Sequence, residues 1–216
     1  MISGYNQVKV ILWDWNGTLL DDVDVCISSM NAMLSSRNKP ELTPDRYREV
    51  FTFPVINYYR RIGWDMEKES WDDLAMEFIG LYLKKLPQAP LHADAFPVLD
   101  YLARKNIRQV IISAMEQNAL VESVEQKGIG RFFERVEGIG DHYAFSKADI
   151  ALKAIQDMNV PPSSACLIGD TLHDLEVAHH ITCDCILVAN GHQTKERLTA
   201  MHDRVVDNLT EIQGFF

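Results

Sequence analysis

The apolar positions of this chain change from a run typical of a buried strand to helical spacing, and then to an alternation of both. Residues 8–14 read Val-Lys-Val-Ile-Leu-Trp-Asp, β-branched and nearly all apolar, as expected for a strand buried on both faces. From about Asp22 to Leu86 the apolar residues follow the helical period and prolines interrupt them, with Thr43-Pro44 typical of a helix start. This segment is predicted to be an insert of several short helices.

Strands and helices alternate in the remainder of the chain. Further strands are expected at 108–113, 136–139, 165–170 and 185–188, with a short edge strand at 205–206. Helices are expected between them, one of which starts near Ser146 and ends near Met158. Such alternation predicts a mostly parallel sheet covered on both faces. The predicted fold is therefore α/β, with a Rossmann-like core domain at 1–20 and 91–216 and an inserted α-helical cap domain at 21–90.

Composition and charge exclude several classes of protein. Apolar residues make up 47% and charged residues 24%, which predicts a globular domain with a buried core. The net charge of −10 argues against binding to nucleic acid or to anionic lipid, since both need basic patches. The beginning of the chain does not resemble a signal peptide, and no apolar stretch approaches the ~20 residues of a membrane helix. We expect a cytoplasmic monomer or homodimer with four reduced cysteines.

Polar residues stand where the predicted strands end. Asp14, Ser113 and Asp170 should meet at one edge of the sheet, where open α/β sheets bind ligands. Asp174 lies four residues after Asp170, so two carboxylates could bind a hard cation there. Each signal also has a simpler reading, because Asp, Asn and Gly form turns and an Asp caps helices. Ser113 and Lys147 would suit a phosphate, although a solvated lysine is the usual reading.

The order and spacing of these signals are more specific than any one of them. Asp14 begins Asp-Trp-Asn-Gly-Thr-Leu, an apolar strand ends in Ser113, Lys147 follows, and Asp170 begins Asp-Thr-Leu-His-Asp. Together they resemble the haloacid dehalogenase superfamily, and the helical insert resembles its α-helical cap. Within the insert, residues 51–54 followed by Gly63 are similar to the cap segment of phosphoglycolate phosphatase-like members.

The resemblance implies a magnesium-dependent hydrolase that acts on a small phosphorylated metabolite. Asp14 would attack phosphorus and form an aspartyl-phosphate, which water then hydrolyses. Mg²⁺ would be bound by Asp14, the backbone carbonyl of Asn16 and Asp170, with Asp174 binding directly or through water.

The resemblance also implies which residues hold the phosphoryl group. Ser113 and the adjacent Ala114 would bind the phosphoryl group during transfer. Lys147 would hold Asp14 and the phosphate together and offset the repulsion between them.

Asn16 departs from the family pattern, which has an aspartate at this position as general acid and base. An amide cannot shuttle a proton, and general acid-base help is typically worth ~10²–10⁴-fold. The chain could be a slow phosphatase, could act on substrates with good leaving groups, or could use another acid such as His173 or His142. The alternative is a catalytically impaired binding or regulatory protein.

Related families catalyse other reactions, which gives a third hypothesis. They transfer phosphoryl groups between sugar positions, or cleave carbon-phosphorus or carbon-halogen bonds. The carbon-phosphorus cleavers use a cap lysine as a Schiff base, for which Lys39, Lys68, Lys84 and Lys85 are available. The two late acidic residues favour a metal and a phosphate over halide displacement.

Overall fold

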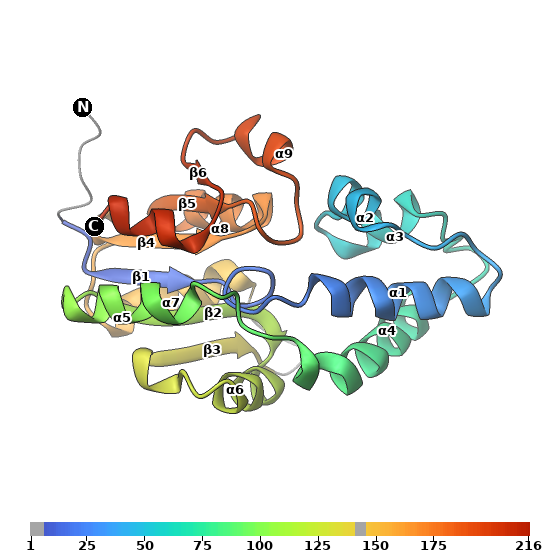
Figure 1. Cartoon of the computed structure of the whole chain (residues 1–216), viewed down its shortest axis with the longest axis horizontal. Coiled ribbons are helices and arrows are strands. Elements are labelled where there is room, and N and C mark those ends of the chain that lie inside the picture. The colour runs from blue at the N-terminus through green and yellow to red at the C-terminus, as the bar shows by residue number, and fades with distance from the viewer. Residues whose placement is uncertain (1–6, 141–145) are drawn as a thin grey trace.

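A parallel sheet forms the centre of the protein, whose computed structural model describes residues 7–140 and 146–216. Within these residues, six strands lie in the order β3-β2-β1-β4-β5-β6 (Figure 1). Their bounds are β1 Val10–Trp13, β2 Arg108–Glu116, β3 Arg135–Ile139, β4 Ala165–Gly169, β5 Asp184–Val188 and β6 Val205–Val206. This is the order of a Rossmann fold, so the predicted α/β class and its parallel sheet are confirmed.

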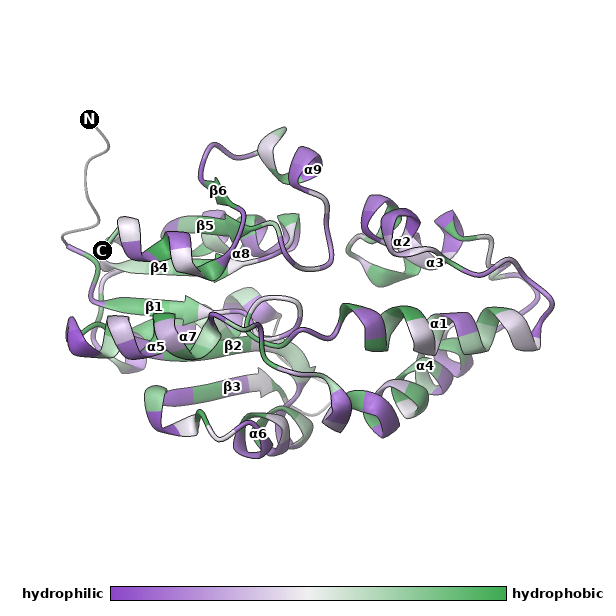
Figure 2. Ribbon diagram, in the orientation of Figure 1, coloured by the Kyte–Doolittle hydropathy of each residue, from purple (hydrophilic) through white to green (hydrophobic). Residues whose placement is uncertain are grey.

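Helices cover both faces of the sheet, as predicted from the apolar sequences of the strands. Along β1, Ile11 and Trp13 pack on one face while Val10 and Leu12 pack on the other, and all four are fully buried. Helices α5 (Ala95–Arg104) and α6 (Gln117–Gln126) and the 3₁₀ helix Leu209–Gly214 cover the first face, and α7 (Lys147–Asp157) and α8 (Leu172–Ile181) the second. The inner strands are accordingly the most apolar part of the ribbon (Figure 2).

The predicted helical insert is present and lies beyond the carboxyl ends of the strands (Figure 1). Its helices are α1 Val23–Ser36, α2 Pro44–Val50, α3 Val55–Arg61 and α4 Trp71–Lys85. Thr43 caps α2 as expected, since its side chain accepts a hydrogen bond from the amide of Arg46. The two chain segments that join insert and core run side by side, because Asp21 N donates to Pro90 O and His92 N to Leu19 O. The domain boundaries at 20/21 and 90/91 stay a prediction.

Two elements differ from the sequence-based expectation. Strand β2 continues to Glu116 instead of ending at Ser113, although its pairing with β1 stops at Ile111 and its register with β3 shifts after Ile112. A short helix not predicted from the sequence, α9 (Lys195–Thr199), begins after Thr194, which caps it. The four cysteines are unpaired, in agreement with the prediction. In the two described ranges, no helix has the length and apolar character needed to cross a membrane.

Candidate active site

Three buried carboxylates meet at the carboxyl edge of the sheet. Asp14 directly follows β1, Asp170 directly follows β4, and Asp174 lies in the first turn of α8. These side chains are 7%, 0% and 1% exposed, and each offers a carboxylate oxygen within 4.8 Å of the others. The structure therefore brings together the three acidic residues that the strand ends and the spacing had singled out.

Lys147 provides the nearest positive charge to these carboxylates. It is the first residue of α7, whose start is fixed by a capping box between Ser146 and Asp149. Its ammonium contacts Asp14 Oδ1 and lies 2.6 Å from Asp174 Oδ1, and the side chain is buried. The usual reading of Lys147 as a solvated surface lysine is therefore excluded.

The site contains more negative charge than its own lysine balances. Burial raises the pKa of Asp14 to about 8, and the Lys147 ammonium offsets only part of that shift. Burial likewise raises the pKa of Asp170 to about 6. For Asp174 the Lys147 charge and hydrogen bonds outweigh burial, so its pKa lies below the ordinary value. A buried, oxygen-rich set of ligands with uncompensated negative charge fits a hard divalent cation such as Mg²⁺.

The loop after β1 locks the carboxylates in place. The hydroxyl of Thr18 lies 3.1 Å from both Asp14 Oδ2 and Asp170 Oδ1. Gly17 has a φ of +77°, and a Cβ at this position would collide with the Asp170 carboxylate and the His192 ring. Glycine is therefore required here, because any side chain would displace a carboxylate of the site.

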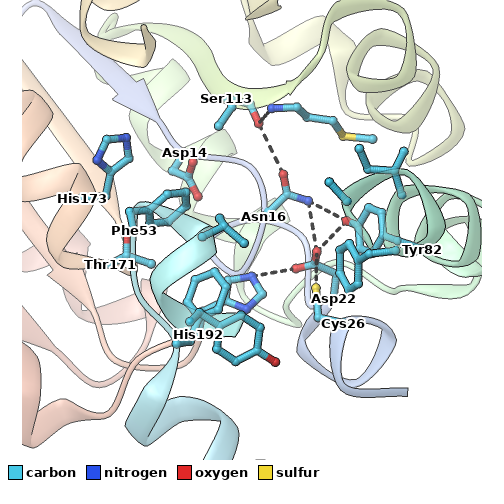
Figure 3. Close-up of a pocket in the computed structure, with 18 of the residues that line it drawn as sticks. Asp14, Asn16, Asp22, Cys26, Phe53, Tyr82, Ser113, Thr171, His173 and His192 are labelled. Atoms are coloured by element: carbon cyan, nitrogen blue, oxygen red, sulfur yellow. Dashed lines mark hydrogen bonds and ion pairs between the residues drawn. The ribbon is translucent and has the colours of Figure 1, made fainter. Parts of the chain in front are cut away.

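Asn16 connects Ser113 of strand β2 to the helical insert. Ser113 Oγ donates to Asn16 Oδ1 at 3.3 Å, and Ala114 beside it also lines the cavity. The amide nitrogen of Asn16 donates to Asp22 Oδ2 at 3.0 Å and to Tyr82 OH at 2.7 Å (Figure 3). The side chain thus uses its oxygen toward the core and its nitrogen toward the insert.

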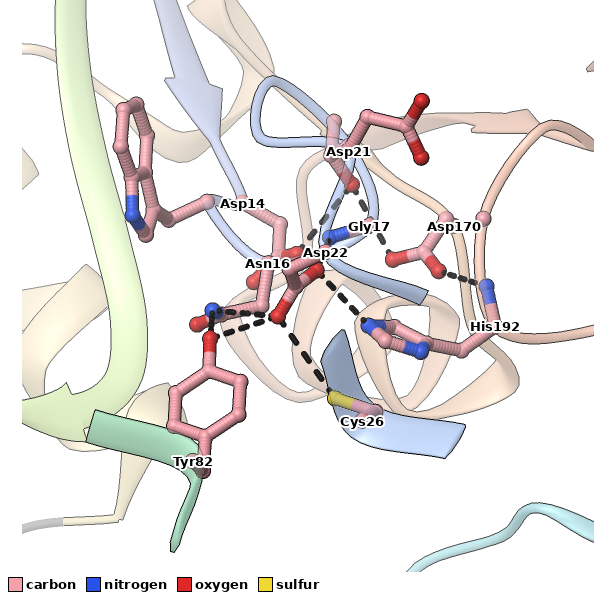
Figure 4. A network of polar contacts seen from close by, with 12 residues as sticks. Asp14, Asn16, Gly17, Asp21, Asp22, Cys26, Tyr82, Asp170 and His192 are labelled. Atoms are coloured by element: carbon pink, nitrogen blue, oxygen red, sulfur yellow. Dashed lines mark hydrogen bonds and ion pairs between the residues drawn. The ribbon is translucent and has the colours of Figure 1, made fainter. Parts of the chain in front are cut away.

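Sequence reasoning missed a buried ion pair between Asp22 and His192 (Figure 4). Asp22 is 1% exposed; its Oδ1 accepts from Gly17 N at 2.8 Å and lies 3.3 Å from His192 Nε2. Its Oδ2 accepts from Tyr82 OH at 2.6 Å. The backbone amide of His192 also donates to Asp170 Oδ2 at 2.6 Å, so the pair supports a carboxylate of the site.

Asp22 and His192 change each other's pKa. Burial alone would lower the pKa of His192, but the charge and hydrogen bond of Asp22, together with the Asp170 and Asp14 carboxylates, outweigh burial and raise the pKa to about 9. Burial alone would raise the pKa of Asp22, but the His192 charge together with hydrogen bonds from His192, Tyr82 and Asn16 holds it below its ordinary value. His192 follows strand β5 by four residues, so the strand-end rule could have found it. Nothing in the sequence distinguishes the buried Asp22 from the exposed Asp21 before it.

A cavity of about 580 Å³ opens from Asp14 into the helical insert. His173 lies at its wall, stacked on Phe53 with ring centroids 4.6 Å apart and with Nδ1 3.3 Å from Glu176 Oε2. The other candidate acid, His142, is outside the described residues. The lysines proposed for Schiff-base chemistry do not line the cavity: Lys39, Lys68, Lys84 and Lys85. Their positions argue against carbon-phosphorus cleavage by that route.

Comparison with known families agrees with this geometry. A family model described as haloacid dehalogenase-like hydrolase matches residues 11–188, which include Asp14, Ser113, Lys147, Asp170 and Asp174. The chain belongs to the haloacid dehalogenase-like hydrolase family. The resemblance seen in its motifs is therefore confirmed.

Curated relatives of this hydrolase are distant but similar over most of their length. It is 24% identical over 217 residues to a phosphoglycolate phosphatase of Chromobacterium violaceum, with 95% of each chain covered. A phosphoglycolate phosphatase of Pseudomonas savastanoi pv. phaseolicola is 23% identical over 205 residues, with 88% of this chain and 75% of that protein covered. These relatives represent the phosphoglycolate phosphatase-like branch, which is the branch expected from the sequence.

Solved structures share the whole fold of this hydrolase. A predicted phosphoglycolate phosphatase from Haemophilus somnus superposes with a TM-score of 0.79 at 16% identity, with 96% of this chain and 97% of that chain covered. CbbY from Rhodobacter sphaeroides, crystallised with phosphate, gives a TM-score of 0.73 at 21% identity, with 95% and 96% covered. At these identities the likeness establishes the fold with its helical insert.

Proposed function

We propose that this hydrolase cleaves phosphomonoesters with Mg²⁺ through an aspartyl-phosphate on Asp14. The observation that carries the proposal is the buried set of Asp14, Asp170 and Asp174, with Lys147 between two of them. Similarity to proteins named phosphoglycolate phosphatase, and to a CbbY crystallised with phosphate, supports phosphoryl chemistry over dehalogenation.

The proposed reaction has two displacements at phosphorus. A carboxylate oxygen of Asp14 bonds to phosphorus as the bond from phosphorus to the ester oxygen breaks. Water then attacks the aspartyl-phosphate, releasing inorganic phosphate and restoring the carboxylate. Ser113, Ala114 and Lys147 bind the phosphoryl group, and the Lys147 charge lessens its repulsion from Asp14.

We propose that residues of the same site bind the metal ion. Asp14, Asp170 and the backbone carbonyl of Asn16 would hold Mg²⁺, with Asp174 binding directly or through water. When bound, the ion neutralises phosphoryl oxygens that gain charge during transfer. The Thr18 hydroxyl and the His192 amide keep the carboxylates oriented for this task.

We also propose that the chain is divided into two domains. Residues 1–20 and 91–216 form the catalytic core domain, and residues 21–90 form the cap domain that supplies the outer walls of the cavity. We place the protein in the cytoplasm as a monomer or homodimer.

The test compares Asp14→Asn with Asp21→Asn, a matched exposed carboxylate of the same segment. Release of inorganic phosphate from acetyl phosphate and p-nitrophenyl phosphate is measured with Mg²⁺ and with EDTA. We expect turnover to fall at least 10³-fold in Asp14→Asn and in EDTA, because the nucleophile or its ion is missing. Asp21→Asn should retain wild-type activity. Undiminished turnover in Asp14→Asn would refute the proposal.

A second candidate function follows from Asn16, which offers no transferable proton. The protein could bind phosphate esters as a regulatory module without turning them over. Calorimetric binding of a phosphomonoester, with no phosphate released over hours, would establish this function. Robust Mg²⁺-dependent turnover would exclude it.

A further inference from the structure

Aromatic side chains from the helical insert build the outer part of the cavity. Eight aromatic rings of the insert line it. Tyr47 and Tyr82 are hydrogen-bonded to His192 and Asp22, and the other six are Phe51, Phe53, Tyr58, Tyr59, Trp71 and Phe78. Three aliphatic residues of α4 continue this wall to the solvent, where Met76, Ile79 and Leu83 are 64%, 43% and 40% exposed. Charged residues, among them Asp14, Asp22 and Glu116, therefore line one part of the cavity, and the rings and aliphatic side chains of the insert form a long apolar wall along another.

As far as residues 7–140 and 146–216 form it, this wall has no free positive charge for a second anionic group. Among the described residues that line the cavity, the fixed cation is Lys147, which is engaged by Asp14 and Asp174. Of the two lining histidines, His192 is paired with Asp22, and His173 lies 3.3 Å from a carboxylate oxygen of Glu176. The carboxylate of phosphoglycolate, or the second phosphate of a sugar bisphosphate, would be desolvated here without a counter-charge, which is costly. The wall favours a substrate whose leaving group is apolar.

Asn16 adds a chemical restriction on the leaving group. An alcohol with a pKa of about 16, close to that of water, must be protonated as it departs. Asn16 cannot donate that proton, and its amide is already bound to Asp22 and Tyr82. A phenol, with a pKa of about 10 like that of tyrosine, can depart as the phenolate. The missing general acid is therefore least harmful for an aryl ester.

From the apolar wall, the absence of a free cation along its described part, and the amide at position 16, we infer that the substrate is an aryl phosphomonoester. The phosphate sits at Asp14 and the aromatic ring of the leaving group stacks among the rings of the wall. The cavity volume of about 580 Å³ has room for more than one ring and lies in the usual range for ligand sites. This inference rests on the proposed phosphohydrolase function and specifies its substrate class.

The first test compares kcat/KM for 2-naphthyl phosphate, hexyl phosphate and phosphoglycolate, all with Mg²⁺. Acetyl phosphate is the reference, because its good leaving group needs neither an acid nor an apolar wall. We expect 2-naphthyl phosphate to exceed hexyl phosphate at least tenfold and phosphoglycolate at least 100-fold.

The outcomes separate the inference from the function on which it rests. If acetyl phosphate is hydrolysed and phosphoglycolate is used as well as 2-naphthyl phosphate, the substrate class is wrong and the phosphohydrolase stands. If hexyl phosphate equals 2-naphthyl phosphate, the aryl requirement is wrong. If Mg²⁺ supports no release from any of these compounds, including acetyl phosphate, the proposed function itself fails.

A pair of variants on α4 tests the wall directly. Ile79→Lys places a cation on the wall, whereas Gly80→Lys places it on the next residue, which is exposed, does not line the cavity and has open space for a side chain. The measured quantity is the ratio of kcat/KM for 2-naphthyl phosphate to that for phosphoglycolate. We expect the ratio to fall at least tenfold in Ile79→Lys and to stay unchanged in Gly80→Lys. An equal ratio in both variants would overturn the inference.

Discussion

Replacing Asn16 with aspartate would restore the family's usual carboxylate, but the structure predicts that this costs stability. The amide nitrogen of Asn16 lies 3.0 Å from Asp22 Oδ2, and Asp22 is buried. In Asn16→Asp a carboxylate oxygen takes the place of this nitrogen. Two carboxylates then stand in hydrogen-bond contact at a partly buried position, a geometry in which one of them takes up a proton.

The loss of stability in Asn16→Asp can be bounded by the cost of keeping both carboxylates charged and the cost of protonating one of them. Repulsion of two unit charges 3.0 Å apart is about 5.5 kcal/mol at an effective dielectric of about 20. Protonating a carboxyl of ordinary pKa about 3.9 at pH 7 instead costs about 4 kcal/mol, so the pair adopts this cheaper solution. The nearby His192 imidazolium and the partial exposure of position 16 reduce the cost further. We expect the free energy of unfolding to fall by about 2–4 kcal/mol at pH 7.

The pH dependence distinguishes this cause from general damage. The introduced pair holds a proton in the folded state that it loses on unfolding, so its destabilisation grows as pH rises from about 4 toward 7. Urea unfolding at pH 5 and pH 7 should show a loss at pH 5 that is smaller by at least 1 kcal/mol. The control Asn16→Ala, which adds no charge, should lose about 1 kcal/mol at both pH values. An Asn16→Asp variant as stable as wild type at pH 7 would refute the reasoning.

Three further predictions concern activity, metal binding and pH. The proton that Asn16→Asp shares with Asp22 can be transferred to a leaving group, so the variant should hydrolyse hexyl phosphate at least tenfold faster than wild type. The initial rate with p-nitrophenyl phosphate should rise less, because its leaving group needs no proton. An equal rise in initial rate for both substrates would contradict this prediction. Mg²⁺ should raise the melting temperature of wild type and of Asp21→Asn but not of Asp170→Asn, as scanning calorimetry against EDTA would show. The His192 pKa of about 9 means that its pairing with Asp22 stabilises the fold below about pH 6.5 and that this stabilisation is lost as pH rises through 9. Urea unfolding in EDTA should therefore show a smaller loss of stability between pH 6.5 and 9.5 in His192→Gln than in wild type.

The carboxylates at the carboxyl edge of the sheet could be predicted from the sequence, because the end of a strand is marked by the residues next to it. Asp14 and Asp170 each follow an apolar run, and parallel strands place such ends together whatever the loops do. Asp174 was found from its spacing to Asp170 on a helix start. The same rule applied after β5 would have reached His192, which is separated from the strand by Ala189, Asn190 and Gly191.

Other parts of the site depend on contacts that span the chain and leave no local pattern. Asp22 is buried because a histidine 170 residues later and Tyr82 of α4 satisfy its oxygens. The aromatic wall arises from α3, α4 and the segment before α3, whose relative placement is set by tertiary packing. Periodicity predicted that these helices exist, but could not predict that their rings line the cavity that opens from Asp14.

The contacts of Asn16 also bear on whether this chain has decayed from an active enzyme. A position freed from selection for catalysis would be expected to keep a loosely held side chain. Here the amide oxygen accepts from Ser113, and both amide hydrogens are used, one toward Asp22 and one toward Tyr82. An ionised aspartate at position 16 could make neither of these donations and a protonated one only one of them, and Asp22 in turn positions His192, whose amide holds Asp170. An amide at position 16 and a carboxylate at position 22 are therefore complementary parts of one network, which favours a site built for a different leaving group over a site that has lost its function.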